Sequence, residues 1–274
     1  DYLTRNGIVV LRYDDRGVGE SKGDFNASTS IDFASDASAA VNYLVSRTDI
    51  PIRNIGIAGH SEGGLIAPIT ASENNEVDFI VLMAGPGIPG DSILLLQGDL
   101  IAKASGMSEE SVKALHELRK NIMQVAKDEI DNDVMRNNMI TLNKNFIANT
   151  PKHILDELEM TEDDVEEGLD IYTGEWMQFF LAYNPRPTLE HTTIPVLAIN
   201  GTTDLQVPYK ENLEAIEKAL IKAGNKNYQI TALNNLNHLF QYSVTGSPME
   251  YGTIEETFNE KSMNIISNWI SAQK

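Results

Sequence analysis

The chain has 274 residues, of which 42% are hydrophobic and 22% are charged, so it is long enough and apolar enough to bury a sizeable core. Its length allows one large α/β domain or a core domain with an inserted subdomain. Asp and Glu together number 40 against 21 Lys and Arg, and the net charge of -19 argues against nucleic acid or an anionic membrane surface as a partner. The chain has no cysteine, which excludes disulfide bonds, thiolate metal sites and a cysteine nucleophile. No apolar run is long enough to span a membrane, and no signal peptide is visible.

The first strand is predicted at residues 8–13, Ile-Val-Val-Leu-Arg-Tyr, because such a β-branched and nearly continuous apolar run is typical of a strand buried in a parallel sheet. A polar, glycine-rich loop at 14–23 follows, at the edge where open α/β sheets place their ligands. This loop lacks the Lys-Ser/Thr ending of a phosphate-binding loop. We therefore interpret it as a structural loop in which Arg16 pairs with a nearby carboxylate. Ser30 is predicted to cap a helix that runs to about Arg47.

A serine lies between the second predicted strand, 55–58, and a helix-compatible segment, 65–71. Residues 59–63, Gly-His-Ser-Glu-Gly, fit the pattern of a nucleophile elbow. A serine on such a sharp strand-to-helix turn has a strained backbone, so the residues two before and two after it are expected to be small. The turn exposes the hydroxyl of Ser61 and aims the N-terminus of the helix at an oxyanion beside it. A glycine-rich turn that contains serine by chance is the alternative, and the flanking strand and helix favour the nucleophile.

After a third predicted strand at 79–84, the strand signal disappears until Thr193 and only helical patterns follow. We therefore expect a core formed by residues 1–90 and 194–274, with 91–193 as a helical cap insertion. The most aromatic stretch of the chain lies in this insertion. It forms either the core of the insert or the wall of an acyl-binding pocket. The candidate pocket residues are Trp176, Phe179, Phe180 and Tyr183.

The alternation of strand and helix resumes with strands predicted at 195–200 and 228–233. Asp204 and His238 each lie just beyond the carboxyl end of one of these strands, on the same sheet edge as Ser61. A serine nucleophile needs a base and the base needs an orienting carboxylate. A turn-forming Asp204 and a loop His238 bonded to backbone are the alternatives. Neither explains why all three residues fall on one edge in the order Ser, Asp, His.

The other four histidines fit the role of the base less well. His60 adjoins the serine and is expected to point away from it. His116 and His153 lie in the helical insert, and His191 precedes a strand, at the wrong edge.

Four segments of the chain are shared with a known group of proteins: 12–19 (Arg-Tyr-Asp-Asp-Arg-Gly-Val-Gly), 59–64 (Gly-His-Ser-Glu-Gly-Gly), 200–208 (Asn-Gly-Thr-Thr-Asp-Leu-Gln-Val-Pro) and 236–241 (Leu-Asn-His-Leu-Phe-Gln). On these motifs the chain resembles serine hydrolases of the α/β-hydrolase fold, and more narrowly a bacterial esterase group. The resemblance implies a mostly parallel sheet flanked by helices, with the insert as a cap between the third and fourth strands seen here. It also implies hydrolysis of small carboxylic esters, with short acyl chains favoured, and it implies neither a cofactor nor a metal.

In this interpretation Ser61 attacks the ester carbonyl, His238 transfers the proton, and Asp204 orients the histidine. The backbone N–H of Glu62 supplies one oxyanion donor. Because relatives are often labelled peptidases, a serine peptidase or an acyltransferase is the nearest alternative. A non-catalytic binding protein on a hydrolase scaffold is an alternative of another class.

The resembling family also has a strand and a glycine-rich loop upstream of the first residues seen here. That loop gives the second oxyanion donor, and its strand lies between the strands that match 8–13 and 55–58. Neither is present in this chain. We therefore expect the native protein to carry an N-terminal extension, and the slot between these strands to be a gap or to be filled by another segment or copy. Without the loop, a poorly folding monomer and a loss of activity of about 10²–10³ are expected.

Overall fold

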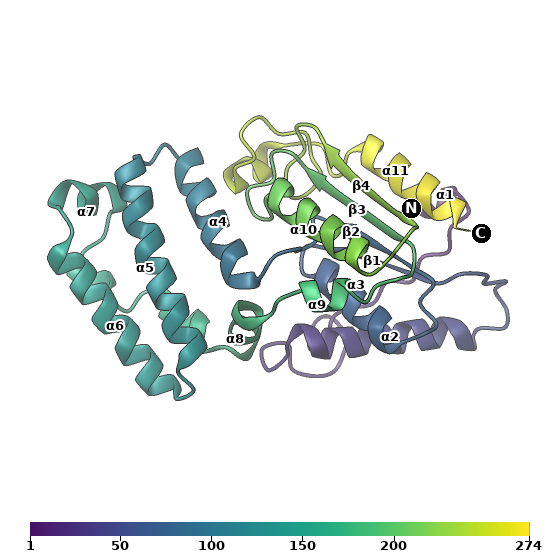
Figure 1. Cartoon of the computed structure of the whole chain (residues 1–274), viewed down its shortest axis with the longest axis horizontal. Helices are drawn as coiled ribbons and strands as arrows, with labels where there is room; N and C mark the ends of the chain where they lie inside the picture. The colour runs from purple at the N-terminus through teal and green to yellow at the C-terminus, as the bar shows by residue number, and fades with distance from the viewer. Residues whose placement is uncertain (274) are drawn as a thin grey trace.

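The computed structural model describes residues 1–273 and has the α/β-hydrolase architecture of a parallel sheet flanked by helices (Figure 1). Four strands lie in the order β1-β2-β3-β4, and every neighbouring pair is parallel. The strands are β1 (Gly56–His60), β2 (Phe79–Met83), β3 (Val196–Gly201) and β4 (Tyr228–Leu233). The predicted strands at 55–58, 79–84, 195–200 and 228–233 are thus confirmed, each with bounds shifted by no more than two residues.

The strand side chains alternate between two buried faces, as the two-residue period of a strand requires. On one face, strand residues pack against α3 (Gly63–Glu73) and α10 (Tyr209–Lys222); the buried ones are Ile80, Leu82, Val196 and Ala198. On the other face, strand residues pack against α11 (Glu260–Ala272); the buried ones are Phe79, Val81, Leu197, Ile199 and Leu233. Covering helices on both sides explain why β2 is apolar along its whole length and β3 along most of it.

The remaining helices fall into two groups. Outside the segment between β2 and β3 lie α1 (Tyr2–Arg5), α2 (Ser30–Ser46) and the 3-10 helix η3 (Pro248–Thr253). Between β2 and β3 lie α4 (Gly90–Ala104), α5 (Glu109–Asp128), α6 (Asn132–Asn149), α7 (Lys152–Leu158), η1 (Glu162–Asp164), η2 (Leu169–Thr173), α8 (Glu175–Ala182) and α9 (Arg186–Leu189). No helix in this described part of the chain is long and apolar enough to cross a membrane.

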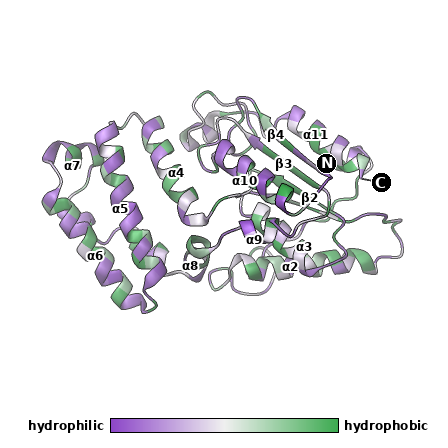
Figure 2. Ribbon diagram, viewed as in Figure 1, coloured by the Kyte–Doolittle hydropathy of each residue, from purple (hydrophilic) through white to green (hydrophobic). Residues whose placement is uncertain are grey.

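In the described chain, many of the helices between β2 and β3 pack around a buried cluster that contains no residue of the sheet. In Figure 1, α4 to α7 stand apart from the sheet, α9 lies close to it against α3 and α10, and α8 lies between these two groups. Figure 2 shows hydrophobic and hydrophilic residues alternating along α5 and α6. Their hydrophobic sides pack together in a separate buried cluster that includes Met135, Met139 and Leu181. The segment is helical as predicted, while its division from the rest as a cap domain stays a prediction.

Two expectations about the N-terminal part of the chain are wrong. Residues 8–13 do not form a buried strand: they are extended coil, and Val9 and Tyr13 are 58% and 48% exposed. A run with high strand propensity becomes a strand only when a neighbouring strand accepts its backbone hydrogen bonds. Ser30 is not the cap of α2 either, because Thr29 takes that position and its N–H donates to Asp32 Oδ2 at 2.9 Å.

In the part of the chain that the structure describes, one side of β1 has no partner strand, although the second strand that was expected to border this slot, 8–13, is not formed. Among the described residues no ladder joins 8–13 to β1, which pairs with β2 alone. Ala58 in β1 is exposed, whereas every residue of β3 is buried. The open side of β1 is therefore an unpaired strand edge. The presence of another segment along it stays a prediction.

Candidate active site

Ser61 lies at the corner between β1 and α3. Its φ of 55° is in the left-handed region, which is uncommon for a residue with a side chain. Its backbone N–H donates to the carbonyl of Met83 at 2.9 Å, which ties the corner to the end of β2. Two residues later α3 begins at Gly63. The strained strand-to-helix turn is thus the geometry that the Gly-His-Ser-Glu-Gly pattern predicted.

Close backbone packing explains two of the three glycines around Ser61. A Cβ at Gly59 would lie 1.9 Å from the carbonyl oxygen of Gly63, and one at Gly64 would lie 2.4 Å from Gly85 Cα. Both positions are therefore closed to any side chain. A Cβ at Gly63 meets nothing within 4 Å. The expectation that the residue two after the serine must be small is therefore wrong for this structure. The crowded position is Gly64, three residues after the serine.

The N-terminus of α3 points free N–H groups toward the corner. Within residues 1–273 the backbone N–H of Glu62 donates no hydrogen bond, while its carbonyl accepts from Leu65 and Ile66 at 2.8 and 3.1 Å. An unpaired N–H at a helix N-terminus, next to a serine hydroxyl, is chemically suited to bind an oxyanion. The assignment of Glu62 N–H as the oxyanion donor stays a prediction.

Asp204 and His238 form a buried pair beyond the ends of β3 and β4. His238 Nδ1 lies 2.9 Å from Asp204 Oδ2, and the two side chains are 7% and 0% exposed. Asp204 Oδ1 accepts the backbone N–H groups of Gln206 and Val207 at 2.8 and 2.9 Å. Because both carboxylate oxygens are engaged, the carboxylate has one orientation. With Nδ1 directed to Asp204, Nε2 is the ring nitrogen left for proton transfer.

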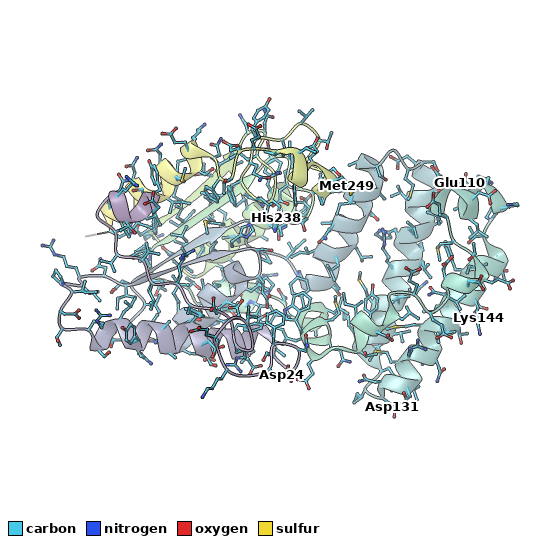
Figure 3. The ribbon with its side chains drawn as sticks, turned by 180° about the vertical axis from the view of Figure 1, so that it is seen from behind. Asp24, Glu110, Asp131, Lys144, His238 and Met249 are labelled. Atoms are coloured by element: carbon cyan, nitrogen blue, oxygen red, sulfur yellow. The ribbon has the colours of Figure 1, made fainter. Side chains whose placement is uncertain are left out.

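Ser61 and His238 lie at the same edge of the sheet, but the predicted hydrogen bond between them is not formed. Among the described residues, no hydrogen bond joins Ser61 Oγ to the His238 ring. Such bonds are often long in sites without substrate and tighten when the substrate binds. Figure 3 shows His238 on the side of the sheet that faces the insert, whereas Glu110 and Lys144 lie far out on the insert. The roles of Ser61, His238 and Asp204 stay predictions.

His60 has a contact that sequence reasoning missed. Its Nε2 donates to the backbone carbonyl of His238 at 2.7 Å, and the two rings lie 4.7 Å apart between centroids. Burial lowers the pKa of His60, so the ring is neutral near pH 7, while the His238 carbonyl opposes this shift. His60 thus fastens the loop that carries His238 to the end of β1. The two residues are 178 positions apart, so no local sequence signal announces the contact.

The three remaining histidines bond elsewhere. His116 Nδ1 lies 2.8 Å from Asp99 Oδ2 inside the insert, and His153 Nε2 lies 3.2 Å from Glu110 Oε2 on its surface. His191 bonds to the carbonyl of Pro187 at 2.7 Å. None of these contacts involves Ser61 or Asp204. Within residues 1–273 no group of three or more His, Asp or Glu side chains is arranged to hold a metal ion.

The aromatic residues of α8 lie beside the helix that follows Ser61. Trp176 stacks on Phe180 with ring centroids 5.1 Å apart, and Phe179 stacks on Tyr183 at the same distance. Phe180 is 7% exposed and packs with Leu65 of α3. The insert therefore approaches the sheet at the edge that carries Ser61, not at the opposite edge. Phe180 belongs to the core between α8 and α3.

A cavity of about 440 Å³ opens beside the corner. It is lined by His60, Leu239, Gln241 and residues 254–258. None of the four aromatic residues predicted as pocket walls lines it. A role for Trp176, Phe179, Phe180 and Tyr183 in substrate binding therefore stays a prediction, supported only by their position next to α3.

Known proteins resemble this chain in sequence and in fold. The sequence profile of the family described as "Serine aminopeptidase, S33" matches residues 1–168. The esterase EstD of Thermotoga maritima is 26% identical over 253 residues, which are 91% of this chain and 50% of that protein. The chain thus spans about half the length of this curated relative.

A solved structure of an esterase from Pyrococcus furiosus has a TM-score of 0.52 and 15% identity, over 99% of this chain and 73% of that chain. The structure of Est1E from Butyrivibrio proteoclasticus with ferulic acid bound has a TM-score of 0.49 and 15% identity. This match covers 94% of the present chain and 74% of the Est1E chain. At such identities a structural likeness concerns the fold alone.

Proposed function

The chain belongs to the α/β-hydrolase family described as serine aminopeptidase, S33, whose profile matches more than half of it, and on this premise we propose that it hydrolyses carboxylic esters. One observation carries the proposal. The buried Asp204–His238 pair, with its 2.9 Å contact, lies at the sheet edge where Ser61 occupies a strained strand-to-helix turn. A hydroxyl, an imidazole and a buried carboxylate in this order support acyl transfer through a serine. The similarity to EstD favours esters over other acyl substrates.

The proposed reaction has two halves. Ser61 Oγ attacks the carbonyl carbon while His238 Nε2 takes the hydroxyl proton, and the carbonyl oxygen becomes an oxyanion next to the N–H of Glu62. The intermediate then expels the alcohol, which receives the proton from His238, and an acyl-serine remains. In the second half, water gives its proton to His238 and attacks the acyl carbon. Release of the carboxylic acid returns the proton to Ser61.

Asp204 acts through His238 and not on the substrate. Its Oδ2 holds Nδ1, so the imidazole presents Nε2 in the tautomer that accepts a proton. When His238 becomes an imidazolium, the buried carboxylate stabilises the new charge, and the short distance in a water-poor site makes this interaction strong. The serine, the imidazole and the carboxylate thus take the roles of nucleophile, general base and orienting group in the proposed reaction.

A second candidate is a serine peptidase, because the matching family is described as a serine aminopeptidase. The same three residues serve this reaction, with an amine in place of the alcohol as the leaving group. An amine must be protonated as it leaves, so the demand on His238 as a general acid is greater. An acyltransferase differs only in the acceptor of the second half-reaction, an alcohol in place of water.

The test is a panel of chromogenic esters with acyl chains from acetyl to octanoyl, run beside aminoacyl anilides and an ester with an added acceptor alcohol. We expect hydrolysis of the short esters to exceed hydrolysis of the anilides. Ser61→Ala is expected to abolish turnover, whereas Ser46→Ala, a change of an exposed serine in α2, is expected to leave it intact. Preference for anilides indicates the peptidase, and preference for transfer to the alcohol indicates the acyltransferase. A folded protein that turns over none of these substrates contradicts the proposal.

A further inference from the structure

The carboxylate of Glu62, the residue after Ser61, joins three separate elements. Its Oε1 accepts a hydrogen bond from Ser30 Oγ at 2.7 Å and another from Trp176 Nε1 at 2.7 Å. Ser30 is the first residue of α2, Glu62 caps α3, and Trp176 lies in α8 of the insert. One oxygen atom thus links the insert to the corner that carries the serine.

Both donors are themselves held in place. Ser30 is fully buried, and Trp176 stacks almost parallel on Phe180, with 10° between the ring planes. Phe180 is buried against α3 and α2. Within residues 1–273 no lysine or arginine forms a salt bridge with Glu62. Its carboxylate accepts hydrogen bonds from the two neutral donors and lies at the N-terminal ends of α2 and α3.

From this geometry we infer that Glu62 is a positioning residue, through which the docking of α8 sets the orientation of the peptide between Ser61 and Glu62. That peptide carries the N–H that we assign to the oxyanion, so the inference rests on the proposed function. The N–H itself has no partner to hold it in the described structure, and the backbone of Ser61 is strained at φ 55°. The carbonyl of the same peptide, that of Ser61, accepts from the Gly64 N–H at 2.8 Å, and the side-chain hydrogen bonds of Glu62 to Ser30 and Trp176 add a second restraint on the orientation of this peptide.

Kinetics separate this role from simple support of the fold. Glu62→Ala removes the acceptor, and we expect kcat to fall about tenfold with KM little changed, because an interaction with the transition state is weakened and substrate binding is not. Glu62→Gln keeps an oxygen acceptor at the same place and is expected to retain most of the wild-type kcat. Trp176→Phe keeps an aromatic ring beside Phe180 but removes the indole N–H, and is expected to lower kcat about threefold.

A double variant tests the link itself. If Trp176 acts through Glu62, Glu62→Ala with Trp176→Phe has the same kcat as Glu62→Ala alone, since the second change removes a partner already lost. Effects that multiply show that the two residues act independently and overturn the inference. Glu73→Ala, at the other end of α3 where the side chain is exposed, is the matched control and is expected to match the wild type.

Fluorescence gives a readout that does not depend on turnover. The chain has two tryptophans, and Trp269→Phe leaves Trp176 as the single emitter. In that background Glu62→Ala is expected to shift the emission to longer wavelength as the indole loses its partner and gains water, and Glu73→Ala is expected to leave it unchanged. An unshifted spectrum for Glu62→Ala overturns the link between α8 and the elbow.

The outcomes distinguish this inference from the function on which it rests. If the wild-type chain neither hydrolyses esters nor reacts with a fluorophosphonate, the proposed function fails. If the wild type is active and Glu62→Ala has the wild-type kcat, only the positioning role fails. Where Glu62→Ala does not fold, Trp176→Phe decides: a lowered kcat with unchanged KM supports the inference, and a wild-type kcat overturns it.

Discussion

His60 Nε2 donates a hydrogen bond to the backbone carbonyl of His238, 2.7 Å away, and so joins the end of β1 to the loop after β4. His60 directly precedes the candidate nucleophile Ser61, and His238 is the candidate base. A bond to the backbone places the whole loop without competing for the His238 ring, whose Nδ1 is held by Asp204. The position of the base therefore depends on the residue next to the nucleophile.

We predict that His60→Ala lowers kcat/KM for a short ester about tenfold, because the loop that carries His238 loses its anchor. His60→Gln, whose amide can donate to the same carbonyl, is expected to recover part of this loss. Steady-state kinetics on both variants provide the check. Equal activities for the alanine variant and the wild type would show that the loop is held by other contacts.

We also expect His60 to make the stability of the protein depend on pH. Burial lowers the pKa of His60 below its ordinary value of 6.5, so the unfolded chain binds a proton there more readily than the native chain. The contribution of His60 to the free energy of unfolding is therefore full above about pH 6.5 and is lost as the pH falls toward the lower native pKa. Urea midpoints at pH 7.5 and 5.5 should differ less for His60→Gln than for the wild type. An equal difference in both proteins refutes the assignment to His60.

For Asp204→Asn we expect kcat to fall by roughly 10³–10⁴, because an amide N–H facing Nδ1 favours the wrong tautomer of His238. The amide oxygen can still accept from Gln206 and Val207, so the fold should be preserved. Turnover of a short ester and thermal unfolding, measured on the same samples, separate the two effects. An active Asp204→Asn variant would remove Asp204 from the proposed mechanism.

Alanine substitutions at two neighbouring glycines test the packing of the corner. Gly59→Ala places a Cβ 1.9 Å from the carbonyl oxygen of Gly63, and overpacking of this kind destabilises by about 1–3 kcal/mol or more. Gly63→Ala places a Cβ in open space at the first residue of α3, where alanine is neutral or stabilising by up to about 1 kcal/mol. Urea unfolding of both variants is the measurement. Equal losses of stability at the two positions contradict the packing argument.

The ion pair of Arg16 in the loop at 14–23 allows a prediction about stability at a distance from the candidate site. Arg16 donates Nε and Nη2 to the two carboxylate oxygens of Asp36, each at 2.7 Å, as the predicted pairing of Arg16 with a carboxylate requires. Arg16→Lys loses this paired geometry and is expected to destabilise the protein by about 0.5–1 kcal/mol. Arg5→Lys, in an exposed pair with Asp1, is the control and should leave the unfolding midpoint unchanged. Equal unfolding midpoints for Arg16→Lys and the wild type would show that the paired hydrogen bonds to Asp36 do not stabilise the protein.

The parts of the fold that could be predicted are those encoded locally. The four strands are short segments rich in apolar or β-branched residues, and the serine stands in a pattern that requires a particular backbone turn. Asp204 and His238 could be placed at the edge of Ser61 because parallel strands end at the same edge of a sheet. Their 2.9 Å contact follows from that placement.

The parts that could not be predicted depend on distant partners. Residues 8–13 have the composition of a strand, but a strand forms only beside another, and β1 pairs with β2 alone in the described chain. The contact between Glu62 and Trp176 joins residues 114 positions apart. No periodicity or motif near Glu62 indicates that its carboxylate faces a tryptophan of the insert. These contacts exist only once the sheet and the insert have been brought together.

The central claim is that Ser61 is a nucleophile activated by His238 and Asp204. Its most direct measurement is the reaction of the protein with a fluorophosphonate, followed by mass mapping of the modified peptide. The account predicts one adduct per chain, located on Ser61, with no adduct in Ser61→Ala and a strongly reduced rate in Asp204→Asn. An adduct on another residue, or a folded chain that does not react at all, would contradict it.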